Sequence, residues 1–541
     1  MYTKALRQKI LDLAIRGKLV PQDPNDEPAS VLLERIHAEK QQMVKDGKLK
    51  PKDIKNDTVI FKGVDNLHYE KFSDGTVKCI EDEIPFDVPE GWTWARLNDL
   101  ALYKKGPFGS SITKAMFVPE SDNAIKVYEQ KNAINKNAHL GHYFISQEKY
   151  QELKGFEIFP GDIIVSCAGT IGETFVMPSD MRKGIINQAL MKIHLYDNSI
   201  KDFYLMYFDN KLKSLANEQG YGMALKNIPP FSVLKQYLIP IPPMAEQEKI
   251  LKRIKIILSN INDIDLLKGK LQSNIANAKS KILDLAIRGK LVPQDPNDEP
   301  ASVLLERIRV EKEEQIKQGK IKRNKKESVI FKGSDNSYYR TINSKTELLE
   351  IGYDYELPDG WEFITVGEYS KKVTDQVASG SFAALRENVK SLKTPDYAIM
   401  VKTADFSNGF TKNLTYTDKH GYEFLENSNL FGGELILNNI GSIGKVFIVP
   451  KLDHKMTLAP NSIMIRLNSE EYRDYLYYFF SSPLGYSALM SISSGAAVTK
   501  FNKTDLKNLV IPIPPLVEQK RIVDEIEKIF ATLDDIANQV V

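Results

Sequence analysis

The sequence predicts an α+β protein in which two mixed α/β domains are separated by long antiparallel coiled-coil helices, in a circular, pseudo-twofold arrangement. Two observations predict this fold. Residues 9–36 recur without a change as residues 281–308, 272 positions later. A heptad pattern of apolar residues runs from Ile250 to Leu285, within a predicted helix from about Ala245 to Ile287. A period this long is typical of duplicated domains and not of a solenoid, so the chain is two copies of one plan.

Shorter motifs repeat at nearly the same offset and predict how the chain is divided. Ile-Pro-Ile-Pro-Pro occurs at 239–243 and again at 511–515, and Glu-Gln follows each copy. Val-Pro-Glu-Gly-Trp at 88–92 pairs with Leu-Pro-Asp-Gly-Trp at 357–361. The predicted parts are an N-terminal helix and connector at 1–84, a first α/β domain at 85–243, a central long helix and connector at 244–353, a second α/β domain at 354–515, and a C-terminal helix at 516–541 that pairs with the central helix.

The two terminal helices are predicted to form together the twin of the central helix. Four-three spacing lays one apolar stripe along a helix, and a stripe this long favours a second helix packed alongside. The central helix would be roughly 63 Å long at 1.5 Å per residue, which makes it a rigid spacer. An ordinary amphipathic core helix is the alternative. The predicted seam, also a candidate for subunit docking, consists of Ile250, Ile254, Ile257, Ile261, Ile264, Leu271, Ile275 and Ile282, of Ile522, Ile526, Ile529, Leu533 and Ile536, and of Leu6, Ile10 and Leu13.

Each α/β domain is predicted from short β-type runs that end in glycine turns. The run at 162–166 precedes Gly-Thr-Ile-Gly at 169–172, and the run at 434–437 precedes Gly-Ser-Ile-Gly at 441–444. A second run follows each turn, which indicates a hairpin. The connectors are identical over 28 residues, whereas the domains retain mainly frame positions. Shared connectors indicate shared partners and diverged domains indicate two targets, although gene conversion could also homogenise a short segment.

Composition limits the class of protein. Hydrophobic residues make up 42% of the 541 residues, and no apolar run approaches the roughly 18 residues of a membrane span. Cys79 and Cys167 are too few for a disulfide framework or a zinc site, so we expect a cytoplasmic protein without a metal. The formal net charge is only +2, so any contact with nucleic acid must use local patches.

The sequence contains no recognisable catalytic motif. Asn-Ile-Pro-Pro-Phe at 227–231 departs from the Asn-Pro-Pro-Phe motif of adenine methyltransferases by an inserted isoleucine. Gly-Ser-Ile-Gly-Lys at 441–445 lacks the first glycine of a phosphate loop. The seven histidines show no metal-ligand spacing. We therefore expect a protein without a catalytic centre of its own.

The duplicated order of motifs resembles the specificity subunit of a type I restriction-modification system. The telling elements are Leu-Pro-Asp-Gly-Trp at 357–361, the strand with its Gly-Thr/Ser-Ile-Gly turn, and Ile-Pro-Ile-Pro-Pro followed by Glu-Gln, all in this order twice. The resemblance implies that each α/β domain is a target-recognition domain reading one half of a bipartite, asymmetric site in double-stranded DNA. The helices would set the spacing of the half-sites and dock two modification (methyltransferase) subunits.

Further expectations follow from the resemblance. Restriction subunits, which are ATP-dependent translocases and nucleases, would join through the modification subunits. S-adenosylmethionine, ATP and Mg would bind to partner subunits, and this chain would bind no cofactor. The stretches at about 37–85 and 309–353 exceed the compact form of the family and receive no role from it.

DNA contacts are expected from Lys, Arg, amide and hydroxyl side chains in loops of the two domains. A protein scaffold or adaptor that does not bind DNA is the rival interpretation, and a free-standing methyltransferase or nuclease is a weaker one. The candidate DNA-binding residues are Lys104, Lys105, Ser110, Ser111, Lys126 and Thr170 in the first domain, and Lys371, Lys372, Lys402, Thr403, Ser442, Thr499, Lys500 and Asn502 in the second.

Overall fold

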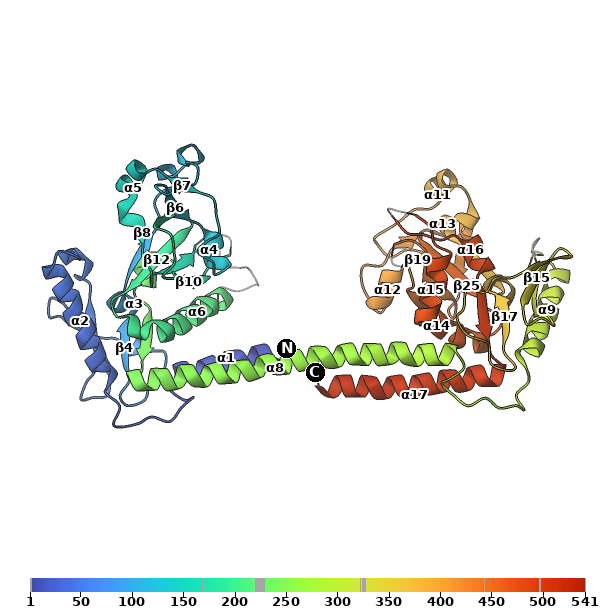
Figure 1. The fold of residues 1–541 in the computed structure, drawn as a ribbon, viewed down its shortest axis with the longest axis horizontal. Helices are drawn as coiled ribbons and strands as arrows, with labels where there is room; N and C mark the ends of the chain where they lie inside the picture. Colours follow the sequence, from blue (N-terminus) through green and yellow to red (C-terminus); the bar gives the residue numbers. More distant parts are fainter. Residues whose placement is uncertain are drawn as a thin grey trace. The chain divides into compact units, whose positions relative to one another are not determined.

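The computed structural model describes residues 2–167, 170–218, 229–321, 323, 327–441, 443–495 and 498–540. Gly169, Asn227, Ile228 and the candidate Ser442 lie outside the described residues. The chain divides into two compact units, Met1–Leu266 and Leu267–Val541 (Figure 1). Among the described residues, no helix has the length and apolar character needed to cross a membrane.

The first unit contains a connector, a recognition-type α/β domain and the front of a long helix. Its elements are α1 (Tyr2–Ile15), α2 (Ala29–Lys45), β1 (Thr58–Lys62), β2 (His68–Phe72), β3 (Val77–Cys79), β4 (Thr93–Arg96), α3 (Leu97–Leu100), β5 (Ala101–Lys105), β6 (Ile125–Tyr128), α4 (Gln130–Ile134), β7 (Phe144–Ile145), α5 (Gln147–Leu153), β8 (Glu157–Ile158), β9 (Ile163–Ser166), β10 (Thr174–Val176), β11 (Gly184–Ile186), β12 (Leu190–Leu195), α6 (Lys201–Glu218), α7 (Phe231–Leu234), β13 (Leu238–Ile241) and α8 (Met244–Ile287), whose rear part belongs to the second unit.

The second unit repeats this order. Its elements are α9 (Ala301–Lys317), β14 (Ser328–Lys332), β15 (Tyr338–Ile342), β16 (Lys345–Leu348), β17 (Glu362–Thr365), α10 (Val366–Tyr369), β18 (Lys372–Asp375), α11 (Phe382–Asn388), β19 (Ala398–Val401), α12 (Thr403–Ser407), β20 (Tyr416–Thr417), α13 (Lys419–Phe424), β21 (Asn429–Leu430), β22 (Leu435–Asn438), β23 (Val446–Ile448), β24 (Lys455–Leu458), β25 (Ser462–Arg466), α14 (Arg473–Ser481), α15 (Pro483–Ser491), α16 (Lys503–Asn508), β26 (Val510–Ile513) and α17 (Leu516–Val540).

The two α/β domains share one sheet topology although their sequences have diverged. In the first, the strand orders are β10-β9-β12-β5 and β7-β6-β11-β8; in the second, β23-β22-β25-β18 and β20-β19-β24-β21 occupy the corresponding places. One parallel pair recurs within the second sheet of each domain, β6 with β11 and β19 with β24. The predicted fold class of two mixed α/β domains with a long helix between them in the chain is confirmed.

The Ile-Pro-Ile-Pro-Pro motif forms the strand that closes each domain. Strand β13 pairs antiparallel with β4, and Ile239 lies opposite Ala95. Strand β26 pairs in the same way with β17, and Ile511 lies opposite Ile364. A proline is tolerated there because each pair is only two-stranded and leaves one side of the strand without a ladder partner. The strand places the following helix, α8 or α17, directly beside the entry strand of its domain.

A buried tryptophan–glutamate hydrogen bond joins each domain to its long helix. Trp92 Nε1 donates to Glu246 Oε2 at 2.9 Å, and Gln22 Nε2 donates to the other oxygen at 3.1 Å. In the second unit Trp361 Nε1 donates to Glu518 Oε2 at 3.1 Å. Burial raises the pKa of both carboxyl groups. The Gly-Trp and Glu-Gln motifs are therefore the two halves of one joint, which we call the Trp–Glu joint.

The glycine at the end of the first helical segment fits against this joint. Gly17 has a φ of +66°, and a Cβ added there would lie 2.4 Å from Pro89 Cγ. Gly289 has the same φ and the same 2.4 Å approach to Pro358 Cγ. Both the left-handed backbone and the lack of space exclude other residues. This constraint explains why glycine occupies the same position, 17 and 289, in the identical segments 9–36 and 281–308.

Helix pairing is antiparallel within each unit. Arg7 of α1 donates to Asn262 of α8 at 2.8 Å. The equivalent pair in the second unit, Lys279 of α8 and Asp534 of α17, is an ion pair at 2.6 Å. The helices α1 and α17 lie alongside the front and the rear of α8 respectively (Figure 1). The predicted antiparallel pairs are thus present, at positions related by the repeat.

The predicted apolar seam is buried only where it also meets an α/β domain. Ile250 and Ile254 pack with Trp92, and Ile522 and Ile526 pack with the core of the second domain. Farther along the helices only two helices cover the stripe, and two helices cannot enclose it. Ile261 and Ile275 remain buried, and Ile257, Leu271, Ile282, Ile529, Leu533, Ile10 and Leu13 are half-buried. The seam residues Ile264, Leu6 and Ile536 are 44%, 41% and 41% exposed.

We expect Trp92→Phe to destabilise the chain more than Trp94→Phe. Both indoles are buried, but Trp94 Nε1 has no hydrogen-bond partner, whereas Trp92 Nε1 serves Glu246. Losing the donor to a buried carboxyl group should add about 1–3 kcal/mol to the cost of losing indole volume. Urea unfolding of both variants measures the difference. Equal losses of unfolding free energy would show that the Trp–Glu joint contributes only packing.

Candidate nucleic-acid interface

In the first domain, several candidate residues lie where strands end at one edge of the sheet β10-β9-β12-β5. Lys105 ends β5 opposite Met191, and Ser166 ends β9 opposite Leu190, so both strands end at the same edge. Burial raises the pKa of the Cys167 thiol to about 12, and the exposed Lys105 ammonium opposes this rise. Cys167 directly follows β9, three positions before Thr170 in the sequence. Ser110 and Ser111 follow in a short 3-10 helix, Gly109–Ser111.

Lys104 and Thr170 are accessible at this edge but already have partners within the domain. The Lys104 ammonium lies 4.8 Å from the centre of the Phe156 ring. The backbone carbonyl of exposed Thr170 accepts a hydrogen bond from Ser166 Oγ at 2.6 Å. Lys105 and Thr170 are exposed candidates at this edge.

Lys126 is not a surface-loop residue, and this prediction is wrong. It lies in β6, is only 4% exposed, and donates to the carbonyl oxygens of His139 and Gly141, both at 3.3 Å. Burial lowers the pKa of Lys126. Its ammonium is used to hold the 139–141 loop, so it is not free to reach a phosphate.

In the second domain the corresponding sheet edge opens into a cleft. The cleft has a volume of about 580 Å³. It contains one predicted residue, Lys402, whose Nζ donates to Thr415 Oγ1 at 2.7 Å. Thr403 begins α12 immediately beyond Lys402. The other polar and charged residues that line the cleft were not predicted from the sequence; besides Thr415 they are Asp375, Gln376, Arg386, Ser391, Lys393, Asn439, Asn461 and Ser462.

Two features suit this cleft to a ligand that carries both a hydrogen-bond donor and anionic groups. The Asn439 side-chain oxygen is buried without a hydrogen-bond partner, while its Nδ2 donates to the Phe501 carbonyl at 3.0 Å. The Asp375 carboxylate is paired with Lys503 at 2.9 Å. The cations of Arg386, Lys393 and Lys402 therefore exceed the anionic charge of the lining. Gln376 and Asn439 directly follow strands β18 and β22, which is the signal that could have identified them, whereas Arg386 lies within α11.

The remaining candidates of the second domain fall at two places. Lys500 pairs with Ile440, and Gly441 donates its N–H to the Thr499 carbonyl at 3.2 Å, so this segment adjoins the cleft. Asn502 caps α16 through hydrogen bonds from Thr504 and Asp505. Lys371 and Lys372 lie instead at the start of β18, at the opposite edge of the sheet, since Lys372 faces Arg466 at the end of β25.

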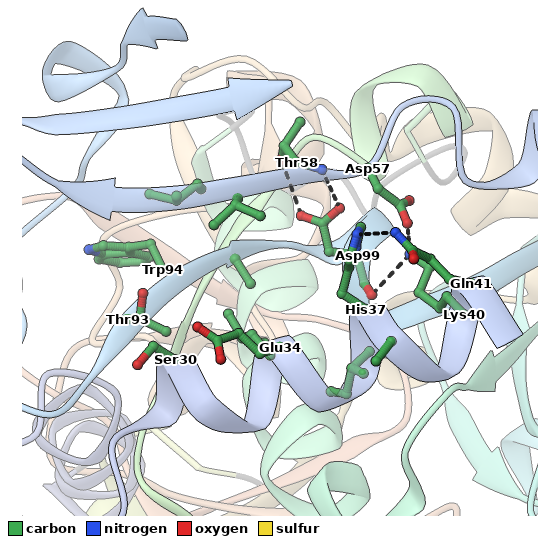
Figure 2. Close-up of a pocket in the computed structure, with 16 residues that line it drawn as sticks. Ser30, Glu34, His37, Lys40, Gln41, Asp57, Thr58, Thr93, Trp94 and Asp99 are labelled. Atoms are coloured by element: carbon green, nitrogen blue, oxygen red, sulfur yellow. Dashed lines mark hydrogen bonds and ion pairs between the residues drawn. The ribbon is translucent and has the colours of Figure 1, made fainter. Parts of the chain in front are cut away.

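The connector of the first unit holds a second, smaller cavity. It measures about 250 Å³ and lies between α2 and strands β1 and β4 (Figure 2). Buried Lys40 pairs with Asp57 at 2.6 Å and donates to the Asp99 carbonyl at 3.2 Å. Asp99 accepts from the Thr58 N–H at 3.0 Å. These charges are paired with one another and the other walls are largely apolar, so the cavity is not a nucleic-acid site.

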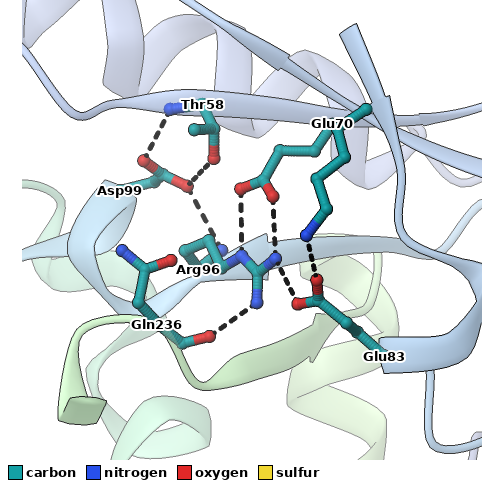
Figure 3. Close-up of polar contacts among 7 residues, drawn as sticks. Thr58, Glu70, Glu83, Arg96, Asp99 and Gln236 are labelled. Carbon is teal, nitrogen blue, oxygen red and sulfur yellow. Dashed lines mark hydrogen bonds and ion pairs between the residues drawn. The ribbon is translucent and has the colours of Figure 1, made fainter. Parts of the chain in front are cut away.

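A buried arginine next to this cavity ties the small sheet β1-β2-β3 to the domain. Arg96 donates to both oxygens of Glu70, at 2.9 and 2.7 Å, and to Glu83 at 2.7 Å. It also donates to the Gln236 carbonyl, and its own N–H donates to Asp99 (Figure 3). Each of the three guanidinium nitrogens of Arg96 thus donates to a partner within the unit.

The chain is similar to known DNA specificity subunits. The family model described as "Type I restriction modification DNA specificity domain" matches residues 89–273 and 358–540. The chain is 26% identical to the type I restriction enzyme EcoEI specificity subunit of Escherichia coli, over 99% of this chain and 90% of that protein. It is 27% identical to the EcoAI specificity subunit of Escherichia coli, over 98% and 89%. The crystal structure of the HsdS subunit from Thermoanaerobacter tengcongensis superposes with a TM-score of 0.44 at 15% identity, covering 84% of this chain and 95% of that one.

We expect the Asp99 carboxyl group to make stability depend on pH. Burial raises the pKa of Asp99 to about 7, although Lys40 and the hydrogen bonds from Thr58 and Arg96 oppose the rise. The unfolded value is roughly 3.9, so the folded state binds the extra proton between these values. The stabilising contribution is full below about pH 4 and is lost as the pH rises to about 7.

The measurement is the free energy of unfolding of the wild type and of Asp99→Asn at several pH values from 4 to 8. The wild type should lose roughly 1–3 kcal/mol relative to the variant between pH 4 and 7, because solvent screening reduces the full effect of the shift. A constant difference between the two proteins would contradict the assignment.

Proposed function

The chain belongs to the family of type I restriction-modification DNA specificity subunits, and we propose that each α/β domain reads one half of a bipartite, asymmetric DNA site. The separate family matches at 89–273 and 358–540 carry this proposal, because each contains one complete domain. The chain recognises DNA sequence and is not itself the catalyst. This role is favoured over that of a scaffold that does not bind DNA.

The reading surface of each domain is the sheet edge at which its candidate polar and cationic residues gather. Amide and cationic side chains are suited to adenine and guanine edges in the major groove, and hydroxyls and lysines to phosphates. The first domain offers Lys105 and Thr170, whereas the second offers Lys402, Asn439 and Arg386. Because the same topology carries different side chains at this edge, the two half-sites should differ in sequence.

The long helices set the distance between the half-sites. Helix α8 has 44 residues without a break, and at 1.5 Å per residue it is roughly 66 Å long. Two readers held by such a helix would contact the duplex a helical turn or more apart, since one turn spans about 34 Å. Spacing of the half-sites then follows helix length.

The identical segments 9–36 and 281–308 support docking of one kind of partner twice. Two modification subunits would bind this chain and recruit restriction subunits, which are ATP-dependent translocases and nucleases. S-adenosylmethionine, ATP and Mg would be bound by these partners in the cytoplasm. Because the buried seam residues such as Ile250 and Ile522 are already covered within each unit, docking would use exposed positions of the same helices, such as Ile264 and Ile536.

The proposal predicts a specific methylation pattern. The chain would be co-expressed with its modification subunit in a methylation-free host, and modified adenines would be mapped by single-molecule sequencing. One split, asymmetric motif that disappears when this chain is omitted is the expected result. The variant Arg386→Ala with Lys402→Ala should relax one half of the motif, because Arg386 is exposed in the cleft and each bidentate pairing with a base supplies about 1–3 kcal/mol of discrimination.

The other half of the motif is the internal control, since the first domain is unchanged. Lys451→Ala is a matched control in the second domain, because Lys451 is already paired with Glu470 on the surface. Relaxation of both halves together, or no motif from a soluble complex, would contradict the proposal.

Helix length provides a separate prediction. Inserting four residues after Lys268 in α8 and four at the C-terminal end of α17 adds about 6 Å. The gap in the methylated motif should therefore grow by about two base pairs, while both half-sites stay the same. Gly269→Ala is the control, because this helical glycine has no atom near its Cβ position and the substitution changes no length. An unchanged gap after insertion would exclude the spacer role.

A further inference from the structure

Each α/β domain presents one phenylalanine ring that is largely exposed. Phe108 is 87% and Phe382 78% exposed, which makes them the two most exposed aromatic side chains among the described residues. An isolated apolar side chain on a protein surface needs no explanation, so the placement of these two rings decides their meaning. We call Phe108 and Phe382 the edge phenylalanines.

The edge phenylalanines occupy equivalent places in domains of diverged sequence. Phe108 lies between β5 and β6, and Phe382 lies between the corresponding strands β18 and β19, at nearly the same distance along the chain from the second strand of each pair. Gly-Ser-Ser-Ile-Thr follows the first ring and Ala-Ala-Leu-Arg-Glu the second, so these neighbours differ at every position. An exposed phenylalanine is therefore present at this place in both domains although its neighbours have changed.

Both rings lie at the sheet edge that we propose to read DNA. Phe108 comes three residues after Lys105, which ends β5 at that edge. Phe382 lines the cleft of about 580 Å³ together with Arg386 and Lys402. Because Phe382 and Arg386 are four residues apart in α11, they share one face of this helix. Each ring is therefore close to a cation that is suited to a phosphate.

Hydrogen bonds hold the backbone next to each ring. Gly106 donates its N–H to the Leu190 carbonyl at 2.9 Å, and Pro107 fixes the next φ angle. In the second domain, Ser381 Oγ caps α11 by accepting from the Ala384 N–H at 3.3 Å. The rings are thus presented from fixed backbone, which reduces the conformational entropy lost when a ring is buried against a ligand.

Two other exposed phenylalanines, at a second pair of equivalent places, have partners within the domain. Phe159 and Phe431 are 50% and 65% exposed, and they precede β9 and β22, at the ends of these strands opposite to the reading edge. The Lys192 ammonium lies 5.6 Å from the centre of the Phe159 ring, and the Arg466 guanidinium lies 4.7 Å from that of Phe431. The edge phenylalanines make no such ring or cation contact with another described residue. Their faces are therefore available to a ligand.

We propose that the edge phenylalanines are wedges that insert between neighbouring bases, one in each half of the DNA site. This rests on the proposed function, in which each domain reads one half-site. An apolar side chain that enters a base step unstacks it and kinks the duplex, and an aromatic ring stacks on the base that it exposes. Contacts of the nearby cations, Lys105 and Arg386, with the adjoining phosphates would offset the cost of unstacking.

A wedge would add specificity without a hydrogen bond to a base edge. Pyrimidine–purine steps unstack and kink more easily than other steps, so a protein that opens a step prefers them. We therefore expect a pyrimidine–purine step at the position of each ring. This selection would complement the hydrogen bonds that the polar side chains of the same edge make to neighbouring bases.

A protein partner fits the edge phenylalanines less well. The modification subunits are proposed to dock on the identical segments 9–36 and 281–308, whereas these rings lie in segments that have diverged. The cleft at Phe382 contains three cations and one carboxylate, which is already paired with Lys503. This excess of positive charge favours the phosphates of DNA over a protein surface of mixed charge.

The experiment uses the full chain in complex with its modification subunit and a duplex that carries the mapped motif. 2-Aminopurine, which fluoresces more strongly when unstacked, replaces in turn each base except the methylated adenine. The wild type should increase the fluorescence at one step in each half-site. Phe108→Ala should remove this signal from one half and Phe382→Ala from the other. Each change should also weaken DNA binding, measured by anisotropy, by at least about fivefold.

Two sets of variants serve as controls. Phe108→Leu and Phe382→Leu keep an apolar wedge and should retain most of the fluorescence signal. Phe159→Ala and Phe431→Ala remove exposed rings from the opposite edge and should leave both DNA affinity and signal unchanged. Circular dichroism reports whether each variant folds, and a titration measures its affinity for the modification subunit, which all variants should retain.

Several results would overturn the inference. A fluorescence signal that survives in the double variant of Phe108→Ala and Phe382→Ala would exclude the rings as wedges, while the intact motif would still support the proposed function. An equal loss for Phe159→Ala and Phe431→Ala would show a general dependence on exposed apolar surface. Weaker binding of the modification subunit with an unchanged signal would assign the rings to that protein. A wild-type complex that binds no motif would overturn the proposed function together with the inference.

Discussion

The Trp–Glu joint is the constraint on which the rest of each unit depends. One carboxyl group at the first turn of a long helix accepts the indole N–H of the entry segment, so helix, closing strand and entry strand are fixed together. The carboxyl is buried and would be costly without these donors. Because the same joint occurs in both units, helix direction relative to each domain is set twice by the same chemistry.

Each unit has one region that attaches the α/β domain to the long helix and another that carries the candidate DNA-contacting residues. In the first domain, strands β4 and β13 hold the domain on its helix, and Lys105 lies at the end of β5 in the sheet β10-β9-β12-β5. In the second domain, β17 and β26 hold the domain on its helix, and the cleft around Asn439 lies at the corresponding edge of the sheet β23-β22-β25-β18. The topologies of the two domains agree strand by strand. The side chains differ along most of both domains, including the sheet edge that carries the candidate DNA-contacting residues, as expected of two readers with different targets on a common framework.

Much of the fold could be predicted from the sequence because the duplication provides an internal comparison. The heptads located α8, and the paired motifs located the joint. Prediction failed where burial depends on how separate elements pack, which a sequence pattern does not show. Lys126 seemed a loop residue, but an alternating strand turns it inward, and Ile264 lies on the correct stripe where only two helices are present to cover it. Asn439, Asn461 and Arg386 come from distant segments that meet only after folding.

The Trp–Glu joint also affects how the specificity of such a protein evolves. Its donors, acceptor and glycine lie outside the sheet edge that carries the candidate DNA-contacting residues, so these stabilising contacts are separate from the residues proposed to read DNA. Substitutions at the edge then alter preference without crossing the stability threshold that removes most mutants. The framework thereby confers evolvability, because new DNA specificities arise through substitutions that leave the free energy of folding almost unchanged.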